Sequence, residues 1–118
     1  NIFAACGSMG GARCWKLAAR TDTGRLIGGR LLLGSLWDES FLASTAFRRH
    51  VPVFFGQGSH DVVFPVGNQE AFFRSIIAKS KAYPYPTRFV RFETGTHGTP
   101  IRMTDWRDTL NWMLSKAP

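Results

Sequence analysis

The chain opens with Asn1-Ile2-Phe3-Ala4-Ala5-Cys6-Gly7-Ser8-Met9-Gly10-Gly11, an apolar run that ends in glycines around a serine. A short apolar run bounded by turn residues predicts a buried strand, here over residues 1–6, followed by a tight turn. Residues 11–20 then place Ala12, Trp15, Ala18 and Ala19 on one face of a helix. The stretch therefore predicts a strand, a sharp turn that carries Ser8, and a helix.

The same alternation continues along the rest of the chain. Apolar runs at 26–36, 50–56 and 87–92 predict three more strands. Helical patterns at 39–49 and 68–81 separate them, with turn signals at 21–24 and a proline-rich break at 83–86. A last helix carries an apolar stripe of Trp106, Leu110, Met113 and Leu114.

This order of elements predicts the fold class. Apolar strands that alternate with amphipathic helices indicate an α/β fold, with a mostly parallel four-stranded sheet covered by helices on both faces. Right-handed crossovers place the carboxyl ends of all the strands at one edge. Functional side chains of such sheets gather at that edge.

Composition limits the class of protein further. With 118 residues and 44% hydrophobic content, we expect one folded domain over 1–118. The net charge of +7 comes from dispersed Lys and Arg without a nucleic-acid motif, so we expect a solvated basic surface and no nucleic-acid partner. No apolar run is long enough to predict a membrane span. No leader precedes Asn1, so a processed or truncated start is expected.

Cysteines and histidines are few. Cys6 and Cys14 do not make a disulfide framework, and we interpret both as buried free thiols. Three scattered histidines and two cysteines have no metal-ligand spacing. No phosphate-binding glycine motif follows a strand. We therefore expect neither a metal nor a cofactor.

Three polar loops follow three of the predicted strands, and each holds one residue of a hydrolytic set. Ser8 lies on the strand-to-helix turn, where its hydroxyl would project outward and the helix amino terminus could stabilise an oxyanion. Asp61 lies in the loop 56–65, and His97 lies in the loop 94–100. A buried carboxylate, an imidazole and a serine hydroxyl form a nucleophilic triad when they lie in line.

These loops resemble those of the α/β hydrolases. Cys6-Gly7-Ser8-Met9-Gly10-Gly11 is similar to the family's nucleophile elbow, G-x-S-x-G, with Cys6 where glycine is usual. The loop after the third strand resembles the family's acid loop, G-x-x-D followed by V-x-P, with Asp61 as the acid. His97 precedes a glycine, as the family's base commonly does, and the order Ser, Asp, His is that of the family.

The resemblance covers the family's carboxyl-terminal half, from the elbow strand to the last helix. It is nearest to small esterases and to dienelactone-hydrolase-like or depolymerase-like carboxylesterases. It implies a serine hydrolase that cleaves small-molecule carboxylic esters through an acyl-enzyme. Ser8 would be the nucleophile, His97 the base and Asp61 its orienting acid, and the Met9 backbone N–H would stabilise the oxyanion.

The neighbouring residues receive weaker assignments. Leu36, Trp37 and Val62 are predicted to line the substrate pocket. Asp38 is the reserve candidate for the acid. We expect no catalytic role for His50 or His60.

An alternative function follows from the half that the resemblance leaves out. In the family, the strands before the elbow supply the second oxyanion donor and one wall of the pocket. The alternative is therefore a catalytically silent half-domain that serves as an assembly or binding module. An elbow strand at the edge of the sheet also presents unpaired backbone groups, which predicts a homodimer or higher homo-oligomer.

Overall fold

Four parallel strands form one sheet in the computed structural model, which describes residues 2–19, 26–80 and 84–116. The strands are β1 (Ile2–Ser8), β2 (Ile27–Ser35), β3 (Val53–Gly58) and β4 (Thr87–Phe92), and they lie side by side in that order. This confirms the predicted α/β class with a parallel sheet. Asn1, the predicted turn at 21–24 and Tyr83 lie outside the described residues.

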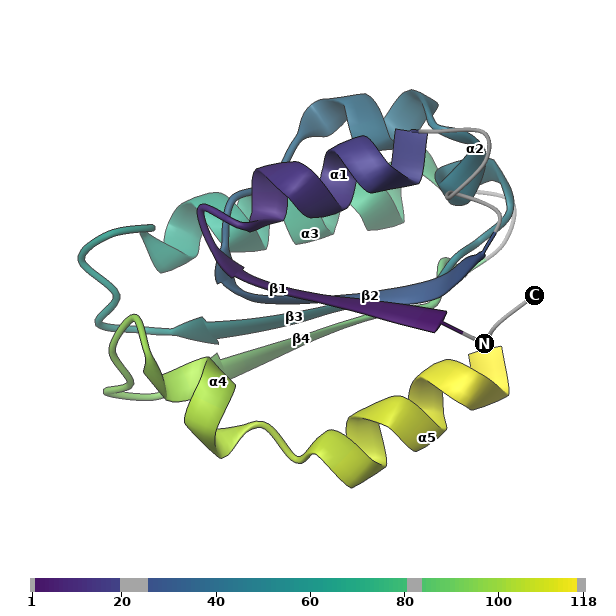
Figure 1. The fold of residues 1–118 in the computed structure, drawn as a ribbon. Coiled ribbons are helices and arrows are strands. Elements are labelled where there is room, and N and C mark those ends of the chain that lie inside the picture. Colours follow the sequence, from purple (N-terminus) through teal and green to yellow (C-terminus); the bar gives the residue numbers. More distant parts are fainter. Residues whose placement is uncertain (1, 20–25, 81–83, 117–118) are drawn as a thin grey trace.

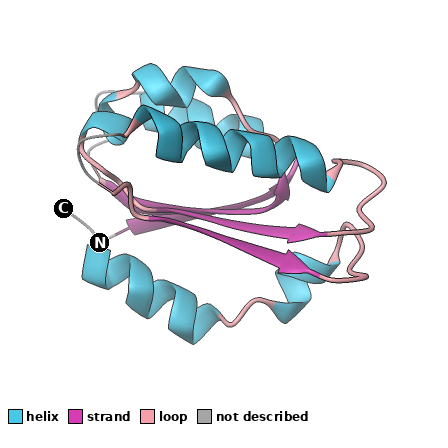
Figure 2. Cartoon of the chain, turned by 180° about the vertical axis from the view of Figure 1, so that it is seen from behind, coloured by secondary structure: helices cyan, strands magenta, loops and turns pink. Residues whose placement is uncertain are grey.

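Helices cover both faces of the sheet (Figures 1 and 2). Each strand lies beside the one before it, so right-handed crossovers keep the connecting helices on a single face. On that face lie α1 (Gly11–Ala19), the 3₁₀ helix η1 (Glu39–Ala43), α2 (Thr45–Arg48) and α3 (Val66–Lys79). The other face carries α4 (Thr99–Met103) and α5 (Trp106–Lys116).

The core has one layer on each side of the sheet. The layer beneath α1, α2 and α3 is rich in aromatic residues and includes Trp15, Phe55 and Phe72. The layer against α5 contains Leu31, Leu33 and Met113. Because side chains alternate along a strand, β2 contributes apolar side chains to both layers, which accounts for its continuous apolar sequence.

Two predicted helical segments differ from the structure. The single helix expected over 39–49 is two elements, because Ser44 interrupts it. The Ser44 Oγ accepts the Phe47 N–H at 3.1 Å and caps the start of α2. The short helix α4, which follows the His97 loop directly, was not predicted.

The buried faces of two helices also differ from the predicted stripes. In α1, Ala12 is exposed, whereas Cys14 and Trp15 are buried. In α5, Met113 is buried as predicted, but Trp106 and Leu114 are 38% and 48% exposed. Trp112 and Thr109 lie beside Met113 in the buried face instead, so the stripe is rotated around the helix.

A disulfide joins Cys6 and Cys14, which corrects the expectation of free thiols. The two Cα atoms lie 6.3 Å apart, within the usual range for a disulfide. The bond links β1 to α1 across the turn that carries Ser8. The turn that carries Ser8 is therefore closed covalently as well as by backbone hydrogen bonds.

Within the described ranges, no helix is both long and apolar enough to cross a membrane.

Candidate active site

Ser8 ends β1 and has a φ of +52°, in the left-handed region that non-glycine residues rarely adopt. The Gly10 N–H donates to the Gly7 carbonyl at 2.9 Å and closes the turn, after which α1 begins. The Leu36 N–H and the Ser35 hydroxyl both donate to the Ser8 carbonyl, at 3.0 and 3.1 Å. Contacts from the end of β2 thus support a strained backbone, which is a feature of functional turns.

Asp61 lies in the loop after β3, and its side chain is completely buried. Its Oδ1 accepts the N–H groups of Val63 and Phe64 at 2.8 and 2.9 Å. Its Oδ2 accepts the Gln57 side-chain amide at 2.9 Å and bonds His97 Nδ1 at 2.7 Å. Each carboxylate oxygen of Asp61 therefore has two hydrogen-bond partners.

These contacts set the charge state of Asp61. Burial by itself raises the pKa of a carboxyl group, but hydrogen bonds to the ionised form lower it. For Asp61 the bonds from His97, from the two backbone N–H groups and from Gln57 outweigh burial, and its pKa lies below the usual value. Asp61 is thus an ionised acceptor at neutral pH.

His97 lies in the loop after β4 and links the other two residues. Its Nδ1 is 2.7 Å from Asp61 Oδ2, and its Nε2 is 2.8 Å from Ser8 Oγ. Because an ionised carboxylate can only accept, Nδ1 carries the proton, and Nε2 of the neutral ring accepts from the serine hydroxyl. The side chain is 29% exposed, so the imidazole reaches solvent while Asp61 does not. Three loops thus bring together the three residues singled out in the sequence.

Two residues that support the hydrogen-bonded line of Asp61, His97 and Ser8 were not identified from the sequence. Gln57 donates to Asp61 and also to the Phe64 carbonyl, both at 2.9 Å, so it holds the loop after β3 in place. Gly34, near the end of β2, has a φ of +54°, and a Cβ there would lie 3.0 Å from the His97 carbonyl oxygen. The only sequence signal for Gly34 is a glycine late in an apolar strand.

The other residues assigned from the elbow and acid loops differ in position. No hydrogen bond of the Met9 N–H is found in the described part of the chain, so this donor is available to a ligand. Val62 is 93% exposed and does not line the pocket next to the three residues.

Asp38, His50 and His60 have other environments. The Asp38 Oδ1 accepts the Ser40 N–H at 2.9 Å and caps η1, so it is not the partner of His97. His50 packs edge-on against Tyr85, with ring centroids 5.7 Å apart. His60 is exposed next to Asp61.

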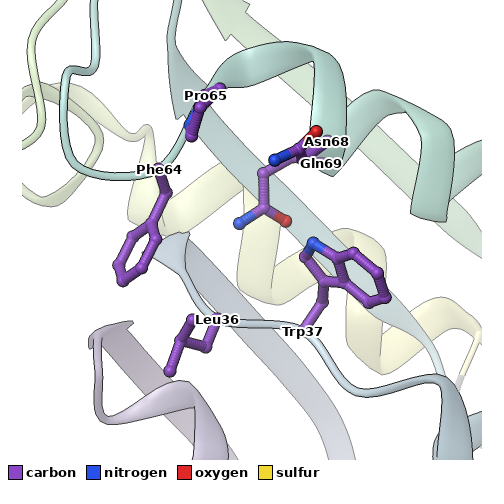
Figure 3. Close-up of a pocket in the computed structure, with 6 residues that line it drawn as sticks. All are labelled: Leu36, Trp37, Phe64, Pro65, Asn68 and Gln69. Atoms are coloured by element: carbon purple, nitrogen blue, oxygen red, sulfur yellow. The ribbon is translucent and has the colours of Figure 1, made fainter.

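A pocket of about 280 Å³ lies beside His97, and Figure 3 shows the residues that line it. Its wall at Phe64 touches the site, because the Phe64 and His97 rings lie 5.4 Å apart. Trp37 stacks on Phe72 at 5.0 Å, which fixes the indole as a flat wall. The lining residues are Leu36, Trp37, Phe64, Pro65, Asn68 and Gln69. Two of the three predicted pocket residues, Leu36 and Trp37, are among them.

Comparisons with known proteins identify the fold. No family model matches the chain, and neither does any curated protein. Solved structures are similar to it, among them the following two. One is a predicted CIB-like hydrolase from Thermoplasma acidophilum, with 18% identity and a TM-score of 0.64, and the match covers 97% of this chain and 50% of that protein. The other is a thermostable esterase, with 20% identity and a TM-score of 0.70, and the match covers 100% of this chain and 31% of that protein.

At these identities the likeness shows the fold alone. The sheet and its flanking helices have the architecture of a shortened α/β-hydrolase fold. The chain spans half the length of one neighbour and about a third of the other.

Proposed function

We propose that this chain is a serine hydrolase that cleaves carboxylic esters through an acyl-enzyme. The observation that carries the proposal is the line of hydrogen bonds from Asp61 through His97 to Ser8. A serine hydroxyl is a weak nucleophile until a base lies within about 3 Å, and the base must be held in the correct tautomer. Both conditions are satisfied at the carboxyl edge of a fold shared with hydrolases.

In the proposed reaction, Ser8 Oγ attacks the ester carbonyl carbon while its proton passes to His97 Nε2. The Met9 N–H would bind the oxyanion that forms on the carbonyl oxygen. Collapse of this intermediate breaks the carbon–oxygen bond to the alcohol, and His97 returns the proton to the leaving oxygen. Water then attacks the acyl-enzyme, its proton goes to His97, and the acid is released with Ser8 restored.

The support for Asp61 as the acid is its isolation from water. A buried ionised carboxylate stabilises the imidazolium that forms when His97 takes the serine proton. Gln57 and the two backbone N–H groups keep the carboxylate from rotating away from the ring. Asp38, which is exposed at the cap of η1, lacks any such contact with His97.

Hydrolysis of 4-nitrophenyl acetate and butyrate by purified protein tests the proposal. Ser8→Ala should lower turnover by roughly 10⁴-fold or more. Ser75→Ala is the matched control, because among the described residues the Ser75 hydroxyl bonds only the Ala71 carbonyl of its own helix. Its turnover should equal that of the unmodified protein.

Equal turnover with and without the Ser8 hydroxyl would refute the nucleophile. Hydrolysis of neither ester by folded protein would contradict the proposal and favour the silent assembly or binding module.

A further inference from the structure

Gln69 carries a buried acceptor that the proposed reaction does not use. The residue lies near the start of α3, and only 3% of it is exposed. Its Nε2 donates to the Ser35 carbonyl at the end of β2. Its Oε1 has no hydrogen-bond partner among the described residues. Leaving a buried amide oxygen without a donor is unfavourable, so such an atom in the wall of a pocket points to a ligand that satisfies it.

The pocket next to Gln69 is the one that adjoins the candidate triad. The Gln69 side chain extends from α3 into the space between Phe64, Leu36 and Trp37 (Figure 3). Leu36, Trp37, Phe64 and Pro65 give the pocket apolar walls, and Asn68 adds a second amide. The stacked Trp37 indole favours a flat group. The Gln69 Oε1 is closed to solvent, so a donor on that group would bind it once the side-chain amide turns slightly toward the pocket.

The position of the pocket selects the part of the ester that enters it. His97 must protonate the leaving oxygen, so the leaving alcohol lies beside the imidazole. Phe64, which contacts that ring, is a wall of the pocket. The pocket is therefore on the leaving-group side of the reaction.

We propose that the pocket selects esters of flat, hydroxylated alcohols, such as dihydric phenols, whose second hydroxyl donates to Gln69 Oε1. This assignment rests on the proposed function for its place in catalysis. It makes Gln69 a residue that determines specificity, because an ester without the second hydroxyl would leave its oxygen unpaired.

Two esters of similar reactivity test the assignment. The leaving phenols of 3-hydroxyphenyl acetate and 3-methoxyphenyl acetate have similar acidity, but only the first offers a donor. The unmodified protein should prefer the hydroxyl ester by about tenfold in kcat/KM, the effect of one buried hydrogen bond. Gln69→Met keeps the length of the side chain and removes both the oxygen and the Nε2 that bonds the Ser35 carbonyl. The preference, which compares two esters on the same variant, should fall to about one. Asn68→Ala removes the neighbouring amide of the pocket and should keep the preference.

A persistent preference in Gln69→Met would overturn the assignment, because the methoxy group would then be rejected by its size. Loss of the preference in Asn68→Ala alone would also overturn it.

A binding measurement separates this assignment from the proposed function. Ser8→Ala protein is titrated with phenol or with fluorobenzene, which has the same shape without the donor, and the Gln69 side-chain amide is followed by NMR. Phenol should shift this signal at several-fold lower concentration than fluorobenzene. Equal effects would refute the hydroxyl site even if the protein hydrolyses esters. A clear phenol preference would support it even if Ser8→Ala showed that the hydrolysis proposal is wrong.

Discussion

Gly34 is the position where one methyl group should disturb the candidate triad most. The residue has a φ of +54°, and placing alanine in this left-handed conformation costs about 1–2 kcal/mol. The added Cβ would lie 3.0 Å from the His97 carbonyl oxygen and 3.4 Å from Asp61 Oδ2. Gly34→Ala should therefore lower the free energy of unfolding by about 1–2 kcal/mol. It should also displace the His97 loop by a few tenths of an ångström.

The expected effect on catalysis follows from that displacement. A misplacement of about 1 Å can cost about a hundredfold, so a smaller shift of His97 relative to Ser8 should lower kcat/KM by about tenfold. Hydrolysis of 4-nitrophenyl acetate gives kcat/KM, and urea denaturation gives the free energy of unfolding.

Gly67→Ala is the matched control for this prediction. A Cβ at Gly67, in the first turn of α3, has no neighbour within 4 Å. This variant should keep full activity and gain up to about 1 kcal/mol of stability from better helix propensity. Full activity in Gly34→Ala would refute the reasoning that β2 holds His97 in register.

Three other predictions concern charge and assembly. The pKa of Asp61 is lower in the folded chain than in the unfolded one. Its ionisation therefore adds stability that is full above about pH 4 and is lost as the pH falls through the folded-state pKa. In urea denaturation between pH 3 and 7, the free energy of unfolding of Asp61→Asn should fall less steeply toward acid pH than that of the unmodified protein, and an equal fall would contradict this. The Arg30 guanidinium is fully buried without a hydrogen-bond partner in the described ranges, and burial lowers its pKa to about 10. Arg30→Met should therefore raise the free energy of unfolding by about 1–3 kcal/mol, and a less stable variant would contradict this. We also propose that two copies of the chain pair through β1, an edge strand with exposed Ile2 and Ala5. Sedimentation at micromolar concentration should then give a dimer for the unmodified protein and a monomer for Ala5→Lys. A monomer for the unmodified protein would refute the proposal.

The sequence was sufficient for the strands and for the loops that follow them. β2, β3 and β4 are short apolar runs between turn residues, and parallel strands must end at one edge. That rule predicted that Ser8, Asp61 and His97 lie at the same edge of the sheet, but it gave no distances between them. Periodicity failed in α5, where Trp106 fits the apolar pattern but is 38% exposed, while Thr109 and Trp112 are buried instead.

Other features depend on contacts between distant segments, which no local pattern records. Cys6 and Cys14 pair because α1 folds back along β1, and eight residues of separation did not reveal this. The role of Gln57 depends on a carboxylate four residues later that turns back toward β3. The unpaired oxygen of Gln69 is visible only once the end of β2 occupies its amide nitrogen.

Covalent labelling of Ser8 tests the central claim most directly. A fluorophosphonate reacts with a serine only when a neighbouring base activates it, so the label reports activation without a known substrate. Mass spectrometry of the labelled, digested protein should find a single adduct on the peptide that contains Ser8. His97→Ala should abolish the adduct, while His60→Ala, which removes the exposed histidine next to Asp61, should leave it intact. Labelling that is absent in folded protein, or that persists in His97→Ala, would contradict the claim that His97 activates Ser8.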